Sequence, residues 1–253
     1  MNCTGFLLIG RGIKKILREP MAPLTGLGMS IFFLLVYNAG IGGIGFLPEF
    51  GDGGYLSFLF PLAIVSLAMG SSSGAGQNLH NDMQSGYFRR MYMTPAPRWA
   101  FIAAPLLADG LSTLLMTGLL IAVGAIFGVK FQFGAISVIG ILALSLLWGI
   151  TLSGFSAGIM LRTGKPQGAQ IVTNAVFPLI FLTTTFLPRE LITSRWLVAI
   201  SWGNPVTYVL EANRYLLAGT SPKYFLMIGI AVLSFGALSA ILFALSGSKK
   251  ALN

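Results

Sequence analysis

The sequence is poor in charge. Charged residues make up 9% of its 253 residues, whereas about a quarter of an ordinary globular domain is charged. Hydrophobic residues make up 55% of the chain. Because so few charged groups cannot cover a surface that faces water, the composition excludes an ordinary soluble domain and predicts a protein that lies within a membrane.

Cysteine, histidine and nucleotide-binding motifs are also scarce. The single cysteine, Cys3, excludes an intramolecular disulfide. The single histidine, His80, has no cysteine or second histidine at ligand spacing, which argues against a metal site. Gly164 and Lys165 come close to a phosphate-binding loop, but the earlier glycine lies at the wrong distance and Pro166 follows the lysine. The sequence therefore predicts neither a metal nor a nucleotide cofactor in this chain.

The chain is rich in long apolar stretches. Six of them cover residues 24–46, 55–75, 100–127, 136–159, 168–187 and 224–246. Each can cross ~30 Å of hydrocarbon at a rise of ~1.5 Å per residue. The runs are continuous rather than alternating, and a helix hides its own backbone polar groups from lipid, so helices are predicted and not barrel strands. The expected fold is an all-α membrane protein with six transmembrane helices in one domain, residues 1–253.

Glycines recur within these stretches. Gly70 with Gly74, and Gly154 with Gly158, have the spacing that lets two helix backbones approach each other closely. We therefore expect these glycines to mark sites of close helix packing.

An amphipathic segment precedes the first apolar stretch, at residues 5–19. At ~100° per residue, its apolar and basic side chains fall on opposite faces of a helix. The apolar face holds Phe6, Ile9, Ile13, Ile16 and Leu17, and the basic face holds Arg11, Lys14, Lys15 and Arg18. The segment is too short and too charged to span a bilayer, so we predict an interfacial helix on the anionic inner leaflet.

The basic residues are divided unequally between the two sides that six spans define. One side holds eleven of the 16 Lys and Arg residues, namely Arg11, Lys14, Lys15, Arg18, Arg89, Arg90, Arg98, Arg162, Lys165, Lys249 and Lys250. The other side holds Lys130, Arg189, Arg195, Arg214 and Lys223. Because cytoplasmic loops carry the excess of Lys and Arg, both termini are predicted to be cytoplasmic, in the cell inner (plasma) membrane. The small basic groups between apolar blocks argue against nucleic acid as a partner.

The long cytoplasmic connection covers residues 77–99. We expect a short helix that Gly86 breaks, and an end to helical structure at the proline-containing run 94–97. The residues beyond the glycine place Tyr87, Phe88, Met91 and Tyr92 beside Arg89 and Arg90. Such a surface could dock another protein.

The long connection on the other side, residues 188–223, is too apolar for a loop in water. Its aromatic residues include Trp196, Trp202 and Tyr208. Aromatic rings of this kind favour the membrane interface, so short membrane-dipping helices are predicted. Asn204 and Pro205 should divide the segment into two helices. Glu211 and Arg214, three residues apart, can pair on one helix face.

Asp109 lies within the third apolar stretch, about nine residues from its start, where a lone carboxylate is costly. It must be protonated, paired or exposed to water. Two interpretations are open. The side chain either moves protons or contacts a substrate, or it makes a buried hydrogen bond to a neighbouring helix.

The two long connections resemble those of a known family. ABC-2-type permeases carry a signature before their last spanning helix that the segment NPVTYVLEANR resembles, with Asn204, Pro205, Tyr208, Glu211 and Arg214. The inner connection is similar to that family's loop between helices two and three, through Asp82, Gly86, Arg89, Arg90, Thr94, Pro95 and Arg98. Gln84 departs from the pattern, since relatives often carry an acidic residue there. The size is similar to that of the drug and lipo-oligosaccharide exporters of the family.

The resemblance implies the membrane-spanning permease subunit of an ATP-binding-cassette exporter. Two permease chains, identical or of two kinds, would work with two copies of a separate ATPase subunit that binds ATP and Mg²⁺. The inner connection would be the coupling helix that fits a cleft of the ATPase, using His80, Asp82, Gly86, Tyr87, Phe88, Arg89, Arg90, Met91 and Tyr92. The outer helices would cap the exit for an amphiphilic substrate (a drug, a lipid or a lipid-linked glycan) that leaves the cytoplasm or the inner leaflet.

Two other classes of protein fit the residues less well. A proton-coupled secondary transporter could use Asp109, but many such transporters are built from internal repeats and this sequence shows none. A membrane-embedded enzyme needs a convergent set of Asp, His, Cys or Ser groups. The apolar stretches of this chain carry Asp109 and scattered hydroxyl groups.

Overall fold

A computed structural model describes residues 21–45, 47, 50, 54–71, 74–86 and 98–250. Every regular element within these ranges is a helix, as the sequence predicts. The elements are α2 (Met21–Ile41), η1 (Gly42–Ile44), α3 (Gly54–Ser71), α4 (Gly74–Gln84), α6 (Arg98–Ile126), α7 (Ala135–Thr163), α8 (Gln167–Phe181), η3 (Arg189–Leu191), α9 (Arg195–Gly203), α10 (Pro205–Ala218) and α11 (Lys223–Lys250).

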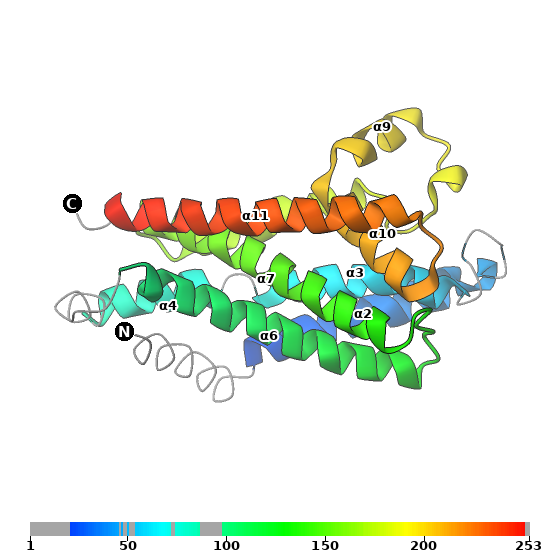
Figure 1. Cartoon of the computed structure of the whole chain (residues 1–253), viewed down its shortest axis with the longest axis horizontal. Helices are drawn as coiled ribbons and strands as arrows, with labels where there is room; N and C mark the ends of the chain where they lie inside the picture. The colour runs from blue at the N-terminus through cyan, green and yellow to red at the C-terminus, as the bar shows by residue number, and fades with distance from the viewer. Residues whose placement is uncertain are drawn as a thin grey trace.

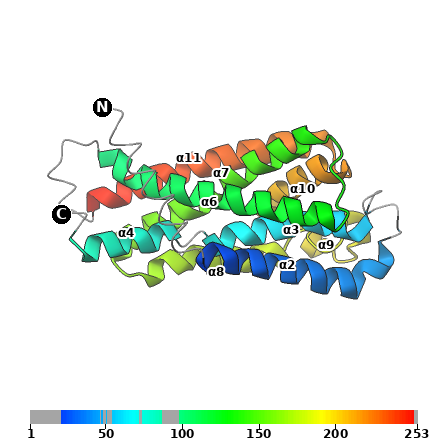
Figure 2. The same ribbon diagram turned by 90° about the horizontal axis from the view of Figure 1, so that it is seen from below.

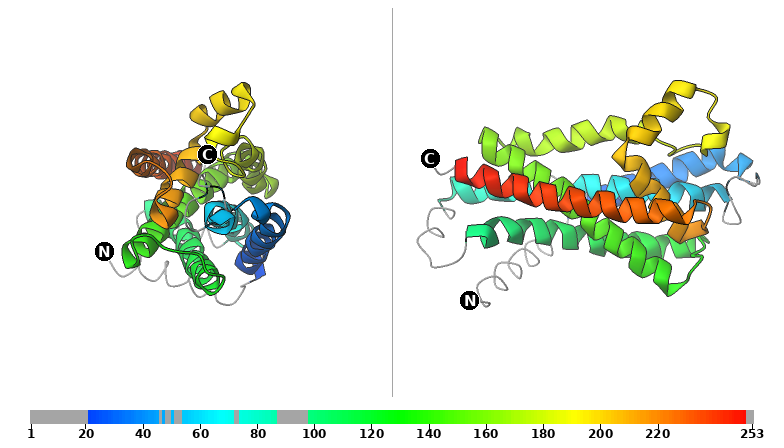
Figure 3. Two further views of the ribbon diagram at one scale, coloured as in Figure 1. Left: turned by 90° about the vertical axis from the view of Figure 1, so that its right-hand side faces the viewer. Right: turned by 45° about the horizontal axis from the view of Figure 1, so that its top comes forward.

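The long helices form one elongated bundle around α7, which contacts α3, α4, α6, α8, α10 and α11. Figure 1 shows α6, α7 and α11 side by side along the length of the bundle. Seen from one end, α2 and α11 lie on opposite sides (Figure 3). The helix α4 lies at one end of the bundle, whereas α9 and α10 lie toward the other (Figure 1). These two ends are called the α4 end and the α10 end below.

Glycines allow the close approach of these helices. A Cβ on Gly154 of α7 would lie 2.8 Å from the Cβ of Ala240 in α11, and one on Gly158 would overlap an aromatic ring of α11. Where α2 crosses α3, a Cβ on Gly70 would lie 2.8 Å from the Cα of Gly26. The close packing predicted at Gly70, Gly154 and Gly158 is therefore confirmed, whereas Gly74 faces the carboxylate of Asp109.

Among the described residues, four segments are long and apolar enough to cross a membrane. They are Gly54–Gln84, which contains α3 and α4, Ile102–Ile126, Ala135–Thr163 and Lys223–Gly247. A shorter apolar helix, Leu24–Gly40, lies within α2. The structure thus supports a helical protein with several spans, and the count of six remains a prediction.

The expectation of one spanning helix over residues 168–187 is wrong in length. The helix found there, α8, has 15 residues and ends at Phe181. At ~1.5 Å per residue it is about 22 Å long, short of the ~30 Å of the hydrocarbon core. The hydroxyl groups of Thr183 and Thr185 donate to the carbonyl of Ile180 over 2.6 and 2.9 Å. They satisfy a carbonyl at the helix end, so the backbone can leave the helix there.

Buried apolar side chains form two clusters. The larger includes most of α3 and parts of α2, α7 and α10. The smaller lies at the α4 end and joins α4 to α6, α7, α8 and α11 through Ala75, Leu79, Ile102, Leu106, Ala157, Met160, Leu161, Ala169 and Ala244. The helix α4 therefore has its own apolar attachment to the bundle.

Two predicted segments lie outside the described residues. They are the interfacial helix over residues 5–19 and the sequence from Tyr87 to Tyr92, with the proline-containing run that follows it. The short helix expected before Gly86 is present as α4, which ends at Gln84. Gly86 itself has a φ of +67°, a left-handed conformation that glycine adopts without strain.

Candidate functional site

The most polar buried site of the described structure centres on Glu211 and Arg214 of α10. The i, i+3 spacing predicts an ion pair, and the structure contains one, with 3.0 Å between Arg214 Nη1 and Glu211 Oε1. The exposed fraction is 2% for the Arg214 side chain and 10% for that of Glu211. This pair is therefore removed from solvent, unlike the surface pairs that contribute little to stability.

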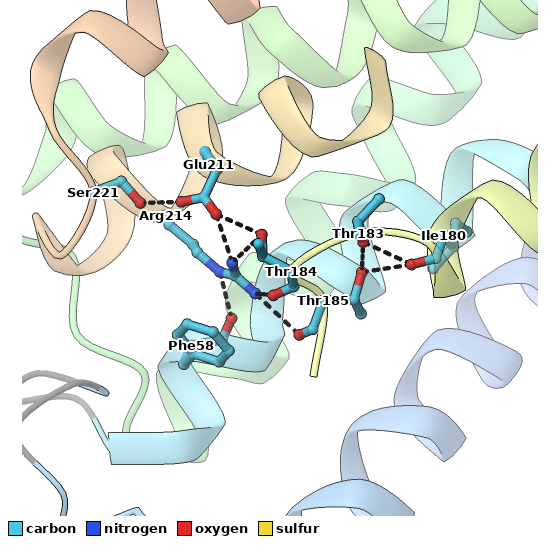
Figure 4. Close-up of polar contacts among 8 residues, drawn as sticks. All are labelled: Phe58, Ile180, Thr183, Thr184, Thr185, Glu211, Arg214 and Ser221. Atoms are coloured by element: carbon cyan, nitrogen blue, oxygen red, sulfur yellow. Dashed lines mark hydrogen bonds and ion pairs between the residues drawn. The ribbon is translucent and has the colours of Figure 1, made fainter. Parts of the chain in front are cut away.

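Every nitrogen of the Arg214 guanidinium group has a partner. Nε donates to the carbonyl of Phe58 in α3 over 3.3 Å, and Nη2 donates to the carbonyls of Thr184 and Thr185 over 2.6 and 3.0 Å. Nη1 donates to the Thr184 hydroxyl as well as to Glu211. The guanidinium carbon also lies 3.6 Å from the centre of the Phe58 ring, a cation–π distance. Figure 4 shows these groups converging between α10 and α3.

The Glu211 carboxylate is also well supplied with hydrogen bonds. It accepts from the Thr184 hydroxyl over 2.5 Å and from the Ser221 hydroxyl. Burial alone would raise the pKa of Glu211, but the charge of Arg214 and the two hydroxyl groups outweigh it and hold the pKa below its usual value. The carboxylate is therefore ionised at neutral pH and neutralises the buried arginine.

This network ties α10 to three other parts of the chain. Its partners lie in α3, in the segment that follows α8 and in the turn that follows α10 (Figure 4). Separation of these parts would leave a buried charge without partners, which is costly. The network therefore favours the arrangement in which they stay together. The pair therefore attaches an outer helix, α10, to the bundle.

Asn204 and Pro205 divide the outer segment as the sequence predicts. The helix α9 ends at Gly203, Asn204 is the N-cap of α10, and its side-chain oxygen accepts from Val206 N over 3.0 Å. The Asn204 amide donates to the carbonyls of Leu179 and Leu182 over 2.7 and 3.3 Å. One side chain thus begins α10 and binds the end of α8.

Contacts of Trp202 hold α9 near α10 and α11. The Tyr208 hydroxyl donates to the carbonyl of Trp202 over 2.6 Å. The guanidinium carbon of Arg189 lies 3.8 Å from the centre of the Trp202 ring and 5.0 Å from that of Phe225 in α11. These contacts account for the position of α9, which stands off the bundle in Figure 1.

Sequence reasoning missed several residues of this site. Thr184 and Thr185 belong to the expected fifth span, and the signal for them is a run of three threonines near the end of an apolar stretch. Ser221 and Arg189 are single polar residues in a long connection. Phe58 contributes a backbone carbonyl, which any residue could supply, so no signal identifies it.

At the α4 end, three of the predicted coupling residues are described. His80 and Asp82 belong to α4, and Gly86 follows it. The ring of His80 lies 3.3 Å from the Gln84 amide, one turn further along α4. The remaining predicted residues, Tyr87, Phe88, Arg89, Arg90, Met91 and Tyr92, lie outside the described residues. Their role as a docking surface stays a prediction.

Asp109 of α6 is buried, with 6% of its surface exposed. Its carboxylate accepts a hydrogen bond of 2.5 Å from the backbone N–H of Ala75, in the first turn of α4. This geometry is the buried hydrogen bond to a neighbouring helix that the sequence left as one of two interpretations. The part of the chain that the structure describes contains no group of three or more His, Cys, Asp or Glu side chains placed to hold a metal ion.

A groove of about 230 Å³ opens between α2, α3 and α8. Its lining includes the apolar side chains of Met29, Phe33 and Phe177 and the hydroxyl groups of Thr25, Ser66 and Thr173. Figure 2 shows α2 and α8 along the same side of the bundle. The surface that faces the groove is predominantly apolar, which suits the apolar part of a ligand.

Comparison with known proteins identifies the family. Residues 5–218 match the family model described as ABC-2 type transporter. The daunorubicin resistance ABC transporter permease protein DrrB1 of Streptomyces coeruleorubidus is 26% identical over 196 residues, which cover 76% of this chain and 67% of that protein. The probable doxorubicin resistance ABC transporter permease protein DrrC of Mycobacterium tuberculosis is 22% identical over 233 residues, 91% of this chain and 82% of that protein.

A third relative is the putative transport permease ycf38 of Cyanophora paradoxa. It is 25% identical over 219 residues, which cover 85% of this chain and 74% of that protein. The family model matches the chain from before its first apolar stretch to the end of α10, and so includes the inner connection and residues 188–218 of the outer one. The chain therefore belongs to the ABC-2 type transporter family and is a membrane subunit of an ABC transporter.

Proposed function

We propose that this chain is the permease subunit of an exporter that moves an amphiphilic substrate out of the cytoplasm or the inner leaflet. ABC-2 permeases work with a partner ATP-binding subunit. In the proposed assembly, two copies of that subunit bind ATP and Mg²⁺, and two permease chains form the pathway. The chain is one transmembrane domain with both termini in the cytoplasm, in the plasma membrane. The observation that carries the proposal is the family match over residues 5–218.

The groove between α2, α3 and α8 supports the substrate class. Two of the relatives are named for resistance to daunorubicin and doxorubicin, so permeases of this family are associated with drugs. The groove of this chain offers aromatic and methionine side chains together with hydroxyl groups. An amphiphile could place its apolar part against the rings and the methionine side chain.

The α10 end supports a role at the exit. The pair of Glu211 and Arg214 holds α10 against α3, one of the helices that line the groove. A movement of α3 would therefore displace α10, because Arg214 of α10 donates a buried hydrogen bond to the Phe58 carbonyl of α3. In the proposed mechanism, α9 and α10 cap the exit and move with α3 when the substrate leaves.

The proposal is tested at the predicted coupling loop. The double variant Tyr87→Ala with Phe88→Ala should still insert and be expressed, because neither residue belongs to an apolar stretch. It should lose the ATPase subunit from detergent-purified complexes and should lose substrate-stimulated ATP hydrolysis and export, since aromatic side chains dominate interface energetics. Wild-type export should stop with vanadate and continue with a protonophore.

A matched control removes two aromatic side chains at the other end. Trp196 and Tyr224 are exposed by 62% and 48%, and their double alanine variant should keep the ATPase bound. If the Tyr87 and Phe88 variant retains both the partner and stimulated hydrolysis, the loop is not the coupling element. If a protonophore stops export while vanadate does not, the chain belongs to a proton-coupled transporter.

A further inference from the structure

The junction between α4 and the bundle is unusually tight. The carboxylate of Asp109 in α6 accepts a hydrogen bond from Ala75 N, and a Cβ on Gly74 would lie 2.9 Å from Asp109 Oδ1. The carboxylate therefore touches the bare backbone of the first turn of α4. The first four N–H groups of a helix lack partners within the helix, and negative charge is favoured near them. Asp109 thus caps α4 from a different helix.

The next residue of α4 is held by two more helices. A Cβ on Gly76 would lie 2.7 Å from the Cβ of Ala169 in α8 and 3.0 Å from the hydroxyl of Ser156 in α7. That hydroxyl donates to the Ala169 carbonyl over 2.8 Å, which fixes α7 and α8 to each other at the same place. The first turn of α4 therefore lies in a socket made by α6, α7 and α8.

The rest of α4 extends from this socket. Leu79 is 1% exposed and packs in the smaller apolar cluster with Ile102 and Leu106 of α6. Beyond it come His80, Asp82 and Gly86, the described residues that open the predicted coupling loop. A displacement of the loop would therefore move the C-terminal end of α4, while the hydrogen bond to Asp109 holds its first turn against α6.

We infer that Asp109 is a positioning residue that transmits movement of the coupling loop from α4 to α6. The inference rests on the proposed function, because it assumes that the ATPase acts through residues 77–99. A proton carrier must alternately release and bind a proton, whereas this carboxylate accepts a hydrogen bond at a helix N-terminus that favours its charge. It contacts the backbone of α4, among its other contacts, and this contact suits mechanical attachment.

The first test removes the attachment in the full complex with its ATPase. Asp109→Ala should leave the ATPase bound and basal hydrolysis unchanged, and should lower the substrate exported per ATP hydrolysed by about tenfold, as expected for loss of one charge-assisted hydrogen bond. Asp109→Asn, which keeps one acceptor oxygen, should lie between the alanine variant and the wild type. Ser145→Ala, which loses a hydroxyl bond to the Leu142 carbonyl within α7, should export normally.

A second variant separates attachment from simple helix capping. Asp109→Ala combined with Gly74→Asp moves the carboxylate from α6 to the first turn of α4, where an acidic residue stabilises the helix from within. The exchange restores a negative charge at the same place but no longer joins the two helices. We expect it to recover the thermal stability lost in Asp109→Ala without recovering export per ATP.

Spin labels give a readout that a purely structural role would not change. Labels on exposed Asn81 of α4 and on Leu107 of α6, which is 40% exposed, should give one narrow distance distribution in the wild-type complex. The distribution should broaden in Asp109→Ala and stay broad in the exchange variant. Wild-type export per ATP in either variant would overturn the inference. If export by the wild type depends on pH, and this dependence is lost in Asp109→Asn while the label distances stay narrow, Asp109 is instead a proton carrier.

Failure of the inference can be distinguished from failure of the proposed function. If the Tyr87 and Phe88 variant loses the ATPase as expected while Asp109→Ala keeps normal coupling, the loop is the docking site and Asp109 is not its attachment. If the Tyr87 and Phe88 variant couples normally, the proposed coupling loop itself is wrong. The proposed transmission through α4 and Asp109, which depends on it, is then wrong as well.

Discussion

Glu211→Ala is the change that most directly tests the buried network at the α10 end. It removes the carboxylate that neutralises Arg214 and leaves the guanidinium group in a site where it is 2% exposed. Arg214 would keep its bonds to the carbonyls of Phe58, Thr184 and Thr185 but would lose its counter-charge. The variant therefore isolates the cost of a buried unpaired cation.

The magnitude follows from this burial. Removal of one partner of a buried ion pair destabilises a protein by about 3–5 kcal/mol. One kcal/mol corresponds to a melting temperature change of about 2–4 °C for a chain of 150–250 residues, so Glu211→Ala should melt roughly 6–20 °C below the wild type. The alanine variant should also export less while it keeps the ATPase bound, because the network lies at the end of the bundle opposite α4.

The assay is thermal unfolding of the detergent-purified protein, with two control variants. Glu211→Gln keeps the shape and one acceptor oxygen and should lose less than the alanine variant. The double change Glu211→Leu with Arg214→Met removes both charges and should regain most of the lost stability, since apolar replacement of a buried pair is often neutral. A melting temperature of Glu211→Ala within about 3 °C of the wild type would place the pair among solvated ion pairs worth about 1 kcal/mol or less, and the reasoning would be refuted.

Three further predictions concern topology, capping and packing. In a cysteine-free background, a single cysteine near Lys165 should react only from the cytoplasm and one near Thr193 only from outside, and the opposite labelling would invert the predicted orientation. Asn204→Asp keeps the N-cap acceptor of α10 but loses both amide donors to the end of α8, so it should lower the unfolding free energy by about 1–3 kcal/mol, and an unchanged melting temperature would contradict this. Gly154→Ala should destabilise the protein by about 1–3 kcal/mol because its Cβ meets the backbone of α11, whereas Gly118→Ala, whose Cβ has its nearest neighbour at 4.0 Å, should be neutral or stabilising, and equal effects would refute the packing argument.

The features that the sequence predicts correctly depend on neighbours along the chain. Helical spans follow from continuous apolar runs, and the division at Asn204 and Pro205 follows from the missing N–H of proline and the capping ability of asparagine. The spacing of Glu211 and Arg214 places them on one helix face. Each of these inferences needs only the geometry of a single helix.

The features that the sequence does not predict depend on distant partners. The Thr184 hydroxyl binds a carboxylate 27 residues further along, and Arg214 binds the carbonyl of Phe58 across 156 residues. The early end of α8 has the same origin, because its last carbonyls are satisfied by threonine hydroxyls and by Asn204. Hydropathy alone predicts one span from such an apolar stretch, because it contains no information on which backbone carbonyls accept hydrogen bonds from distant side chains.

Asp109 shows the same limit at the α4 end. Its depth in an apolar stretch indicates a costly carboxylate, but one group that binds it is a backbone N–H 34 residues earlier. Any residue other than proline supplies such an N–H, so the partner leaves no mark in the sequence. The neighbouring glycines carry the available signal, because the close approach of a carboxylate to Gly74 excludes a side chain there.

The two buried carboxylates among the described residues, Asp109 and Glu211, hold short helices at opposite ends of the bundle. Burial of a carboxylate is costly, and both side chains offset that cost through contacts that join one part of the chain to another. Glu211 attaches α10 through a fully bonded ion pair, whereas Asp109 attaches α4 through a helix N-terminus. Loss of Glu211 should therefore lower stability and export together. Loss of Asp109 should leave ATP hydrolysis running with about tenfold less export per ATP, and this difference separates an element that holds the exit from one that transmits force.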